Sequence, residues 1–170
     1  MDINGVAKEN DFWICGLILT VTVFLIIAKI LDSVNFGFFV GPFRLHHWFV
    51  LIGALYLVLA VPVFSISRRR HPNHARSLLR LHMFGNLSAF ALISLHFTSE
   101  ISRPVEYFPN LGTGLASYIA LILLVATGIF QRFPLTLKIR AQTYRFLHTG
   151  AAVTVYLIIV IHILHGLGLL

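Results

Sequence analysis

The sequence predicts an all-α membrane protein with five transmembrane helices, on the evidence of its composition, its apolar runs and its helix breakers. Hydrophobic residues make up 58% of the 170 residues and charged residues only 11%, whereas about a quarter of the residues in soluble domains are charged. The net charge of +7 comes from short clusters between apolar runs and not from one basic surface, so nucleic acid is not an expected partner. We expect a single integral membrane domain over residues 1–170.

Five apolar runs are each long enough to span a bilayer, which takes roughly 20 residues. They cover residues 12–31, 45–66, 78–99, 112–131 and 144–168. The first run is too long, and the start of the chain too acidic, for a cleaved signal peptide, so we expect it to stay as a helix. The breakers expected in the connections are Gly37, Gly41, Pro42, Pro72, Pro104, Pro109 and Pro134,.

The cations predict the orientation in the membrane. Most of them lie in SRRRHPNHAR, between spans two and three, and in QRFPLTLKIRAQTYR, between spans four and five. The positive-inside rule places both loops in the cytoplasm. The N-terminus is then cytoplasmic, and the C-terminus faces outward together with DSVNFGFFVGPFR and SEISRPVEYFPN. The expected location is the cell membrane of a prokaryote.

Two pairs of histidines share one spacing. His82 and His96 are fourteen residues apart in the third span, and His148 and His162 are fourteen apart in the fifth. Fourteen residues make nearly four helical turns, so the members of each pair share a helix face at a separation of about 21 Å. Because spans three and five run in the same direction, His82 and His148 are expected at one depth near the inner face, and His96 and His162 near the outer face.

Facing imidazoles at matched depths predict haem. Ionisable residues are costly inside a membrane and usually functional, and paired neutral imidazoles are the axial ligands of six-coordinate haem iron. A zinc or copper site would need three or four donors at one depth. Small residues near the histidines, namely Gly85, Ala89, Ala151 and Ala152, are expected to leave room for a macrocycle. Since the chain has no C-x-x-C-H motif, the two haems b are expected to bind non-covalently.

This pattern resembles the bis-histidine dihaem membrane cytochromes, namely cytochrome b of the quinol-oxidising complexes and the ferric reductase and NADPH oxidase family. The stretches YRFLHTG and HILHG in the fifth span look closer to the ferric reductases. The resemblance implies that spans two to five form a haem-binding four-helix bundle. It also implies that His82 and His148 ligate the inner haem iron, and that His96 and His162 ligate the outer one.

Two further features follow from the resemblance. Gly114 and Gly128 in the fourth span, also fourteen residues apart, resemble the paired glycines that let haems approach a companion helix in cytochrome b. The second span departs from that pattern, because it has only Gly53. No flavin or nicotinamide domain follows Leu170, so electrons are expected from a separate carrier or subunit.

The remaining cationic and histidine residues allow more than one interpretation. The arginines that flank the expected ligands are candidates to pair with haem propionates, although topology alone would also place arginines there; they are Arg80, Arg145 and Arg103. His46 and His47 open the second span, where solvation at the interface is expected and a quinone or third-haem contact is the alternative. His71 and His74 are expected in solvent. His165 is seventeen residues from His148 and therefore turned aside, so His162 is the expected ligand.

The function expected from these features is electron transfer by a b-type dihaem cytochrome, between a donor on one face of the bilayer and an acceptor on the other. Its partner would be a redox protein or subunit, or a membrane quinone, and whether the chain is itself an enzyme is left open. The alternative is a haem-free transporter or channel subunit whose histidines relay protons. Against it, the chain has only six carboxylate side chains, and within spans two to five only Glu100, at an interface. A purely structural anchor would not need four matched histidines.

Overall fold

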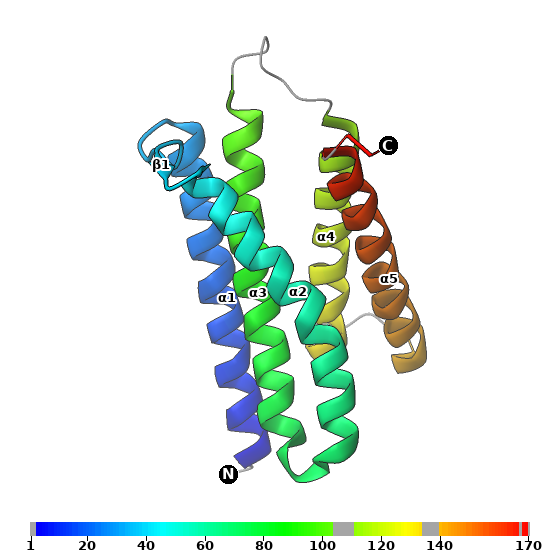
Figure 1. The fold of residues 1–170 in the computed structure, drawn as a ribbon. Coiled ribbons are helices and arrows are strands. Elements are labelled where there is room, and N and C mark those ends of the chain that lie inside the picture. Colours follow the sequence, from blue (N-terminus) through cyan, green and yellow to red (C-terminus); the bar gives the residue numbers. More distant parts are fainter. Residues whose placement is uncertain (1–2, 104–110, 134–139, 167, 170) are drawn as a thin grey trace. The chain divides into compact units, whose positions relative to one another are not determined.

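The computed structural model describes residues 3–103, 111–133, 140–166 and 168–169. Its elements are α1 (Ile3–Ile30), β1 (Phe39–Val40), β2 (Phe43–Arg44), α2 (Leu45–Arg70), a 3-10 turn η1 (Pro72–His74), α3 (Ala75–Ile101), α4 (Leu111–Arg132) and α5 (Ala141–Gly166). Within these residues, five helices are long and apolar enough to cross a membrane (Figure 1). The prediction of five helices that are long and apolar enough to span a membrane is thereby confirmed. The expected breakers Pro104, Pro109 and Pro134 lie outside the described residues.

The chain divides into two compact units, residues 1–103 and residues 104–170. The first unit contains α1, α2, α3 and the β1–β2 hairpin, and the second contains α4 and α5. The single domain and the four-helix bundle of spans two to five therefore stay predictions.

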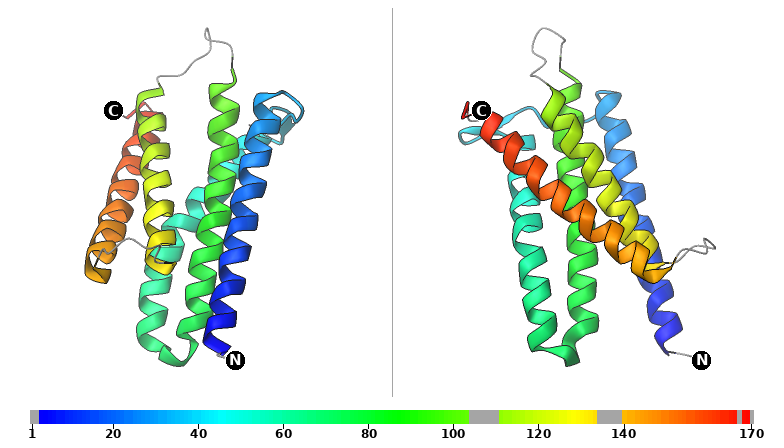
Figure 2. Two further views of the ribbon diagram at one scale, coloured as in Figure 1. Left: turned by 180° about the vertical axis from the view of Figure 1, so that it is seen from behind. Right: turned by 90° about the vertical axis from the view of Figure 1, so that its right-hand side faces the viewer.

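In the first unit, α3 packs against both α1 and α2 (Figures 1 and 2). Small residues allow the close approach of α2 and α3. A Cβ atom added to Gly53 of α2 would lie 3.0 Å from the carbonyl oxygen of Ala89, and Ala89 itself is only 2% exposed. Helices in lipid pack through such small residues, because backbones can then come close together. The room expected for a macrocycle at Ala89 is therefore used for helix packing.

The side chain of Tyr56 lies against Gly85. A Cβ atom added to Gly85 would overlap the Tyr56 ring, whose hydroxyl donates a hydrogen bond of 2.8 Å to the carbonyl of Leu81. The space that the sequence suggested for a macrocycle at this position is thus filled by an α2 side chain.

We expect Gly85→Ala to destabilise the first unit by about 1–3 kcal/mol, because overpacking forces the Tyr56 ring from its hydrogen bond. Gly16→Ala in α1 is the matched control, since an added Cβ there meets nothing within 4 Å. The free energy of unfolding, measured in mixed detergent micelles, should fall only for Gly85→Ala. Equal stability of the two variants would contradict the packing of Tyr56 on Gly85.

A short hairpin fixes the start of α2. Strands β1 and β2 are antiparallel, with Phe39 opposite Arg44, and Gly41 in the turn has a φ of 63° that favours glycine,. The indole nitrogen of Trp48 donates a 2.8 Å hydrogen bond to the carbonyl of Val40. The amide of His46 donates to the carbonyl of Phe36 at 3.2 Å. This hairpin, which the sequence did not predict, anchors the first turn of α2 and with it His46.

In the second unit, α4 and α5 form an antiparallel pair joined through residues outside the described part of the chain (Figure 2). Glycines of α4 lie against histidines of α5.

Candidate functional site

The four expected ligands lie on two helices in two different units. His82 and His96 are on α3 of the first unit, and His148 and His162 are on α5 of the second. Their pairing across α3 and α5 therefore stays a prediction.

His162 contacts a Thr-Gly dipeptide of α4. The hydroxyl oxygen of Thr113 lies 3.0 Å from the Nδ1 atom of His162. A Cβ atom added to Gly114 would lie 3.4 Å from Cε1 of the same imidazole, an ordinary van der Waals contact. One residue of α4 thus binds the ring through a hydrogen bond, and the next lets the ring lie against the helix.

His148 contacts α4 in the same way, through a second Thr-Gly dipeptide that lies fourteen residues further along α4. The hydroxyl oxygen of Thr127 lies 3.2 Å from Nδ1 of His148, and a Cβ atom added to Gly128 would lie 3.1 Å from its Cε1. The Thr127 hydroxyl also donates to the carbonyl of Leu123 at 2.9 Å. A hydroxyl has a single hydrogen to donate, so where the Leu123 carbonyl takes it, the Thr127 oxygen accepts the hydrogen of His148 Nδ1,. His148 is then the tautomer whose Nε2 atom has the lone pair that a metal ion takes.

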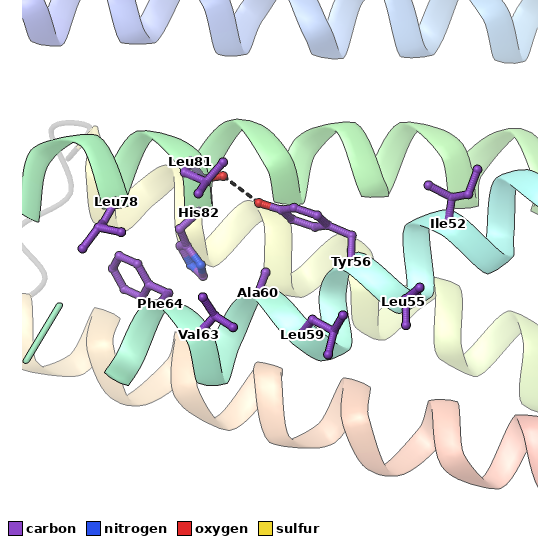
Figure 3. Close-up of a pocket in the computed structure, with 10 residues that line it drawn as sticks. All are labelled: Ile52, Leu55, Tyr56, Leu59, Ala60, Val63, Phe64, Leu78, Leu81 and His82. Carbon is purple, nitrogen blue, oxygen red and sulfur yellow. Dashed lines mark hydrogen bonds between the residues drawn. The ribbon is translucent and has the colours of Figure 1, made fainter. Parts of the chain in front are cut away.

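His82 lies beside an apolar groove between α2 and α3. The groove has a volume of about 390 Å³ and is shown in Figure 3. It is lined by Ile52, Leu55, Tyr56, Leu59, Ala60, Val63, Phe64, Leu78, Leu81 and His82. The Phe64 ring stacks on the imidazole with ring centroids 4.4 Å apart. The amide nitrogen of Asn86 lies 3.2 Å from Nδ1 and 3.3 Å from Nε2 of His82, so it donates to a ring nitrogen.

His96 belongs to a cluster at the other end of α2 and α3, which we call the His/Glu cluster and define as His46, His47, His96 and Glu100. Their candidate ligand atoms all lie within 4.8 Å of one another. Nδ1 of His46 lies 3.3 Å from Nδ1 of His96 and 3.4 Å from Oε1 of Glu100. Nε2 of His47 lies 3.5 Å from the same Glu100 oxygen. The sequence therefore identified one member of this cluster as a ligand and placed the other three at an interface.

The expectation of a solvated His46 is wrong. Its side chain is among the largest that are fully buried, with an exposed fraction of 1%. A signal for this was present in the sequence. His46 precedes His71 by 25 residues and His96 follows it by 25, so a helical hairpin that turns near His71 brings the two to the same level. His71 and His74, at that turn, are exposed as expected.

Two of the three candidate arginines have carboxylate partners in their own unit. The Nε atom of Arg80 lies 2.9 Å from Oδ1 of Asp11 on α1, and Asp11 is 1% exposed. A guanidinium nitrogen of Arg103 lies 2.7 Å from Oε1 of Glu100. Arg145, near the start of α5, is exposed. Pairing of any of them with a propionate stays a prediction.

Comparison with models of protein families, with curated proteins and with solved structures finds no match for this chain. The case for a function therefore rests on the chain's own residues. Those residues offer two kinds of site, namely single histidines oriented by a polar neighbour and one compact His/Glu cluster.

Proposed function

We propose that the chain is a membrane cytochrome with two non-covalent haems b, each ligated by a histidine of α3 and a histidine of α5. The observation that carries the proposal is the repeated arrangement on α4 and α5. Each α5 histidine has its Nδ1 atom beside a threonine hydroxyl and its ring edge against the following glycine. The repeat has the fourteen-residue interval of the histidines themselves.

The repeated threonines support metal ligation, because histidine ligands generally bond their second ring nitrogen to a fixed partner. That bond sets the tautomer and holds the ring in one orientation. The α3 histidines also have polar neighbours, His46 for His96 and Asn86 for His82. For His82 to be a ligand, the Asn86 amide would turn so that its buried oxygen accepts the ring N–H and leaves the other nitrogen for iron,. A histidine that only packed between helices would not need the same neighbours at two levels of α4.

The residues around His82 fit an apolar ligand. The groove of about 390 Å³ beside it is within the range of about 300–1,000 Å³ typical of ligand sites, and its lining is aliphatic and aromatic. Apolar walls exclude water, and Asn86 orients the imidazole. Room for a macrocycle would come from this groove and not from Gly85 or Ala89, which contact α2.

In the proposed function the haems supply the one-electron chemistry, and the chain holds them at two depths in the bilayer. The cationic loop SRRRHPNHAR would face the cytoplasm, so electrons would pass between a donor on one face and an acceptor on the other. A redox protein or subunit and a membrane quinone are the partners to test. Arg145 near the start of α5 is available to a propionate at the inner level.

The first test is the haem content of the purified full-length chain. We expect about two haems b per chain in a pyridine haemochrome assay, as the two histidine pairs require, with the sharp reduced bands of low-spin bis-histidine haem. Expression with added haem precursor guards against incomplete loading. A chain that folds with five membrane spans but takes up no haem would contradict the proposal, and would favour the haem-free transporter that relays protons.

The two glycines of α4 give a matched pair of variants. A Cβ atom at Gly128 would lie 3.1 Å from His148, tighter than an ordinary contact, whereas one at Gly114 would lie 3.4 Å from His162. We expect Gly128→Ala to push the His148 ring from Thr127 and to weaken the haem that it holds by about tenfold. Gly114→Ala should leave haem binding unchanged. Haem retention on dilution in detergent is measured for both variants. Equal losses of haem would contradict the tighter packing of Gly128 against His148.

A further inference from the structure

We propose that the His/Glu cluster is a binding site for one divalent transition-metal ion, with Zn²⁺ as the best fit. The ion would be bound by His46 and His47 at the start of α2 and by His96 and Glu100 near the end of α3. It would bind whether or not the chain also holds haem.

Three of the six distances between donor atoms are those of a tetrahedral site, and all six are within 4.8 Å. Zinc bonds of about 2.0–2.1 Å in tetrahedral geometry place neighbouring donors about 3.3–3.4 Å apart. The separations are 3.3 Å from His46 Nδ1 to His96 Nδ1, 3.4 Å from His46 Nδ1 to Glu100 Oε1, and 3.5 Å from His47 Nε2 to Glu100 Oε1. Three edges of the coordination polyhedron are thus in place without any movement of the side chains.

Helix geometry explains how four residues reach one point. His96 and Glu100 are four residues apart on α3, so their side chains lie on the same helix face. His46 and His47 are in the first turn of α2, which the β1–β2 hairpin fixes through the amide of His46. The antiparallel turn near His71 then brings both pairs to the same level of the first unit.

The donor chemistry also favours a transition metal. Three imidazoles and one carboxylate suit Zn²⁺ and its neighbours in the first row, whereas Mg²⁺ and Ca²⁺ prefer sites made of oxygen atoms. Four protein donors leave no open position, which is typical of a structural zinc site. Such an ion would join the start of α2 to the end of α3.

A buried carboxylate oxygen of the cluster points to a ligand. Oε1 of Glu100 is buried and makes no hydrogen bond of regular geometry, although an Arg103 nitrogen lies 2.7 Å away. Nδ1 of His47 is also buried without a hydrogen-bond partner among the described residues, but Nε2 is the nitrogen that lies near Glu100, so an ion in the cluster would not satisfy Nδ1. Buried polar groups normally have partners, and exceptions call for an explanation such as an absent ion. With a metal ion on Oε1, Arg103 would bond the second carboxylate oxygen and hold the ligand in place.

The proposed metal site shares His96 with the proposed outer haem. The cluster uses Nδ1 of His96, whereas haem iron binds a histidine through Nε2,. One imidazole can serve both sites only as an imidazolate, because the ring nitrogen that carries the hydrogen in the neutral form has to release that proton to bind the second metal. The metal site does not depend on the haem proposal, because its other three donors have no part in that proposal.

The test uses the full-length chain in detergent, stripped of metal with a chelator and titrated with Zn²⁺ alone, and separately with Co²⁺ as a spectroscopic probe. We expect one Zn²⁺ per chain by calorimetry, and the intense visible bands of tetrahedral Co²⁺. His46→Asn and Glu100→Gln should each weaken binding by at least about tenfold. His74→Asn is the matched control, because His74 is exposed at the opposite end of α2 and α3.

Circular dichroism of each variant shows whether it folds, and haem content is measured on the same samples. Binding that survives both His46→Asn and Glu100→Gln would overturn the site, as would the absence of stoichiometric binding to the folded parent chain. A chain that binds Zn²⁺ but has no haem would overturn the proposed function and leave the metal site standing. A chain that holds both haems but binds no Zn²⁺ would overturn the metal site and leave the proposed function standing.

Discussion

Replacing His162 by alanine is expected to remove one of the two proposed haems, whereas replacing His165 is expected to leave both. Nδ1 of His162 lies beside the hydroxyl of Thr113, and its ring lies against Gly114. His148 makes the equivalent contacts with α4 fourteen residues away. His162 and His165 are both exposed near the end of α5, so the α4 contacts and the helix geometry distinguish them. His165 is seventeen residues from His148, so its side chain points about 100° away from the direction of the His148 side chain around the helix axis. For His162 the difference is about 40°.

Haem content per chain and stepwise redox titration measure this difference. The His162→Ala variant should lose one titration component completely, because an iron without one axial ligand is no longer held as a low-spin bis-histidine haem. The His165→Ala variant should keep both components with a small shift at most. Loss of haem on replacing His165, with retention on replacing His162, would mean that the fourteen-residue interval had selected the wrong ligand.

The five helices could be predicted because a long apolar run is a strong and local signal. Their ends could not be placed equally well. Helix α1 begins at Ile3 and not at residue 12, and α2 extends to Arg70 and not to residue 66. Hydropathy detects only the part of a helix that lies in hydrocarbon, whereas backbone hydrogen bonding continues through polar residues at the interface. The β1–β2 hairpin is too short to give any periodic signal.

The His/Glu cluster was missed for a different reason. Each of its histidines was judged by its own position along the chain, and a residue at the end of an apolar run is expected in solvent. Burial of His46 depends on which residue of α3 lies opposite it. That depends on the turn near His71, from which His46 and His96 are equally distant. The sequence therefore held the necessary information in the register of a helical hairpin.

The small residues show the limit of composition as evidence. Gly85 and Ala89 were expected to make room for a macrocycle, but they contact Tyr56 and Gly53 of α2. A small side chain marks a close approach without identifying what approaches. In contrast, Gly128 was singled out through its fourteen-residue interval from Gly114, and it lies against a candidate ligand. Spacing that matches a second pattern is the better guide.

Replacing His82 and replacing His148 are expected to remove the same haem. His82 is on α3 and His148 is on α5, and parallel spans would place both at the inner level of the membrane. Each variant should lose the same component of the redox titration and keep the other. His82→Ala and His148→Ala combined should therefore remove no more haem than either change alone, whereas His82→Ala with His162→Ala should remove both haems.

This comparison measures the relation between the two units, because a shared haem requires α3 and α5 to face each other. His71→Ala is the matched control, since His71 is exposed beyond the end of α2 and should change neither component. If His82→Ala and His148→Ala removed different components, haem would be bound but the parallel pairing would be wrong. The two units would then have to pair their histidines in another order, and His82 would have a partner other than His148.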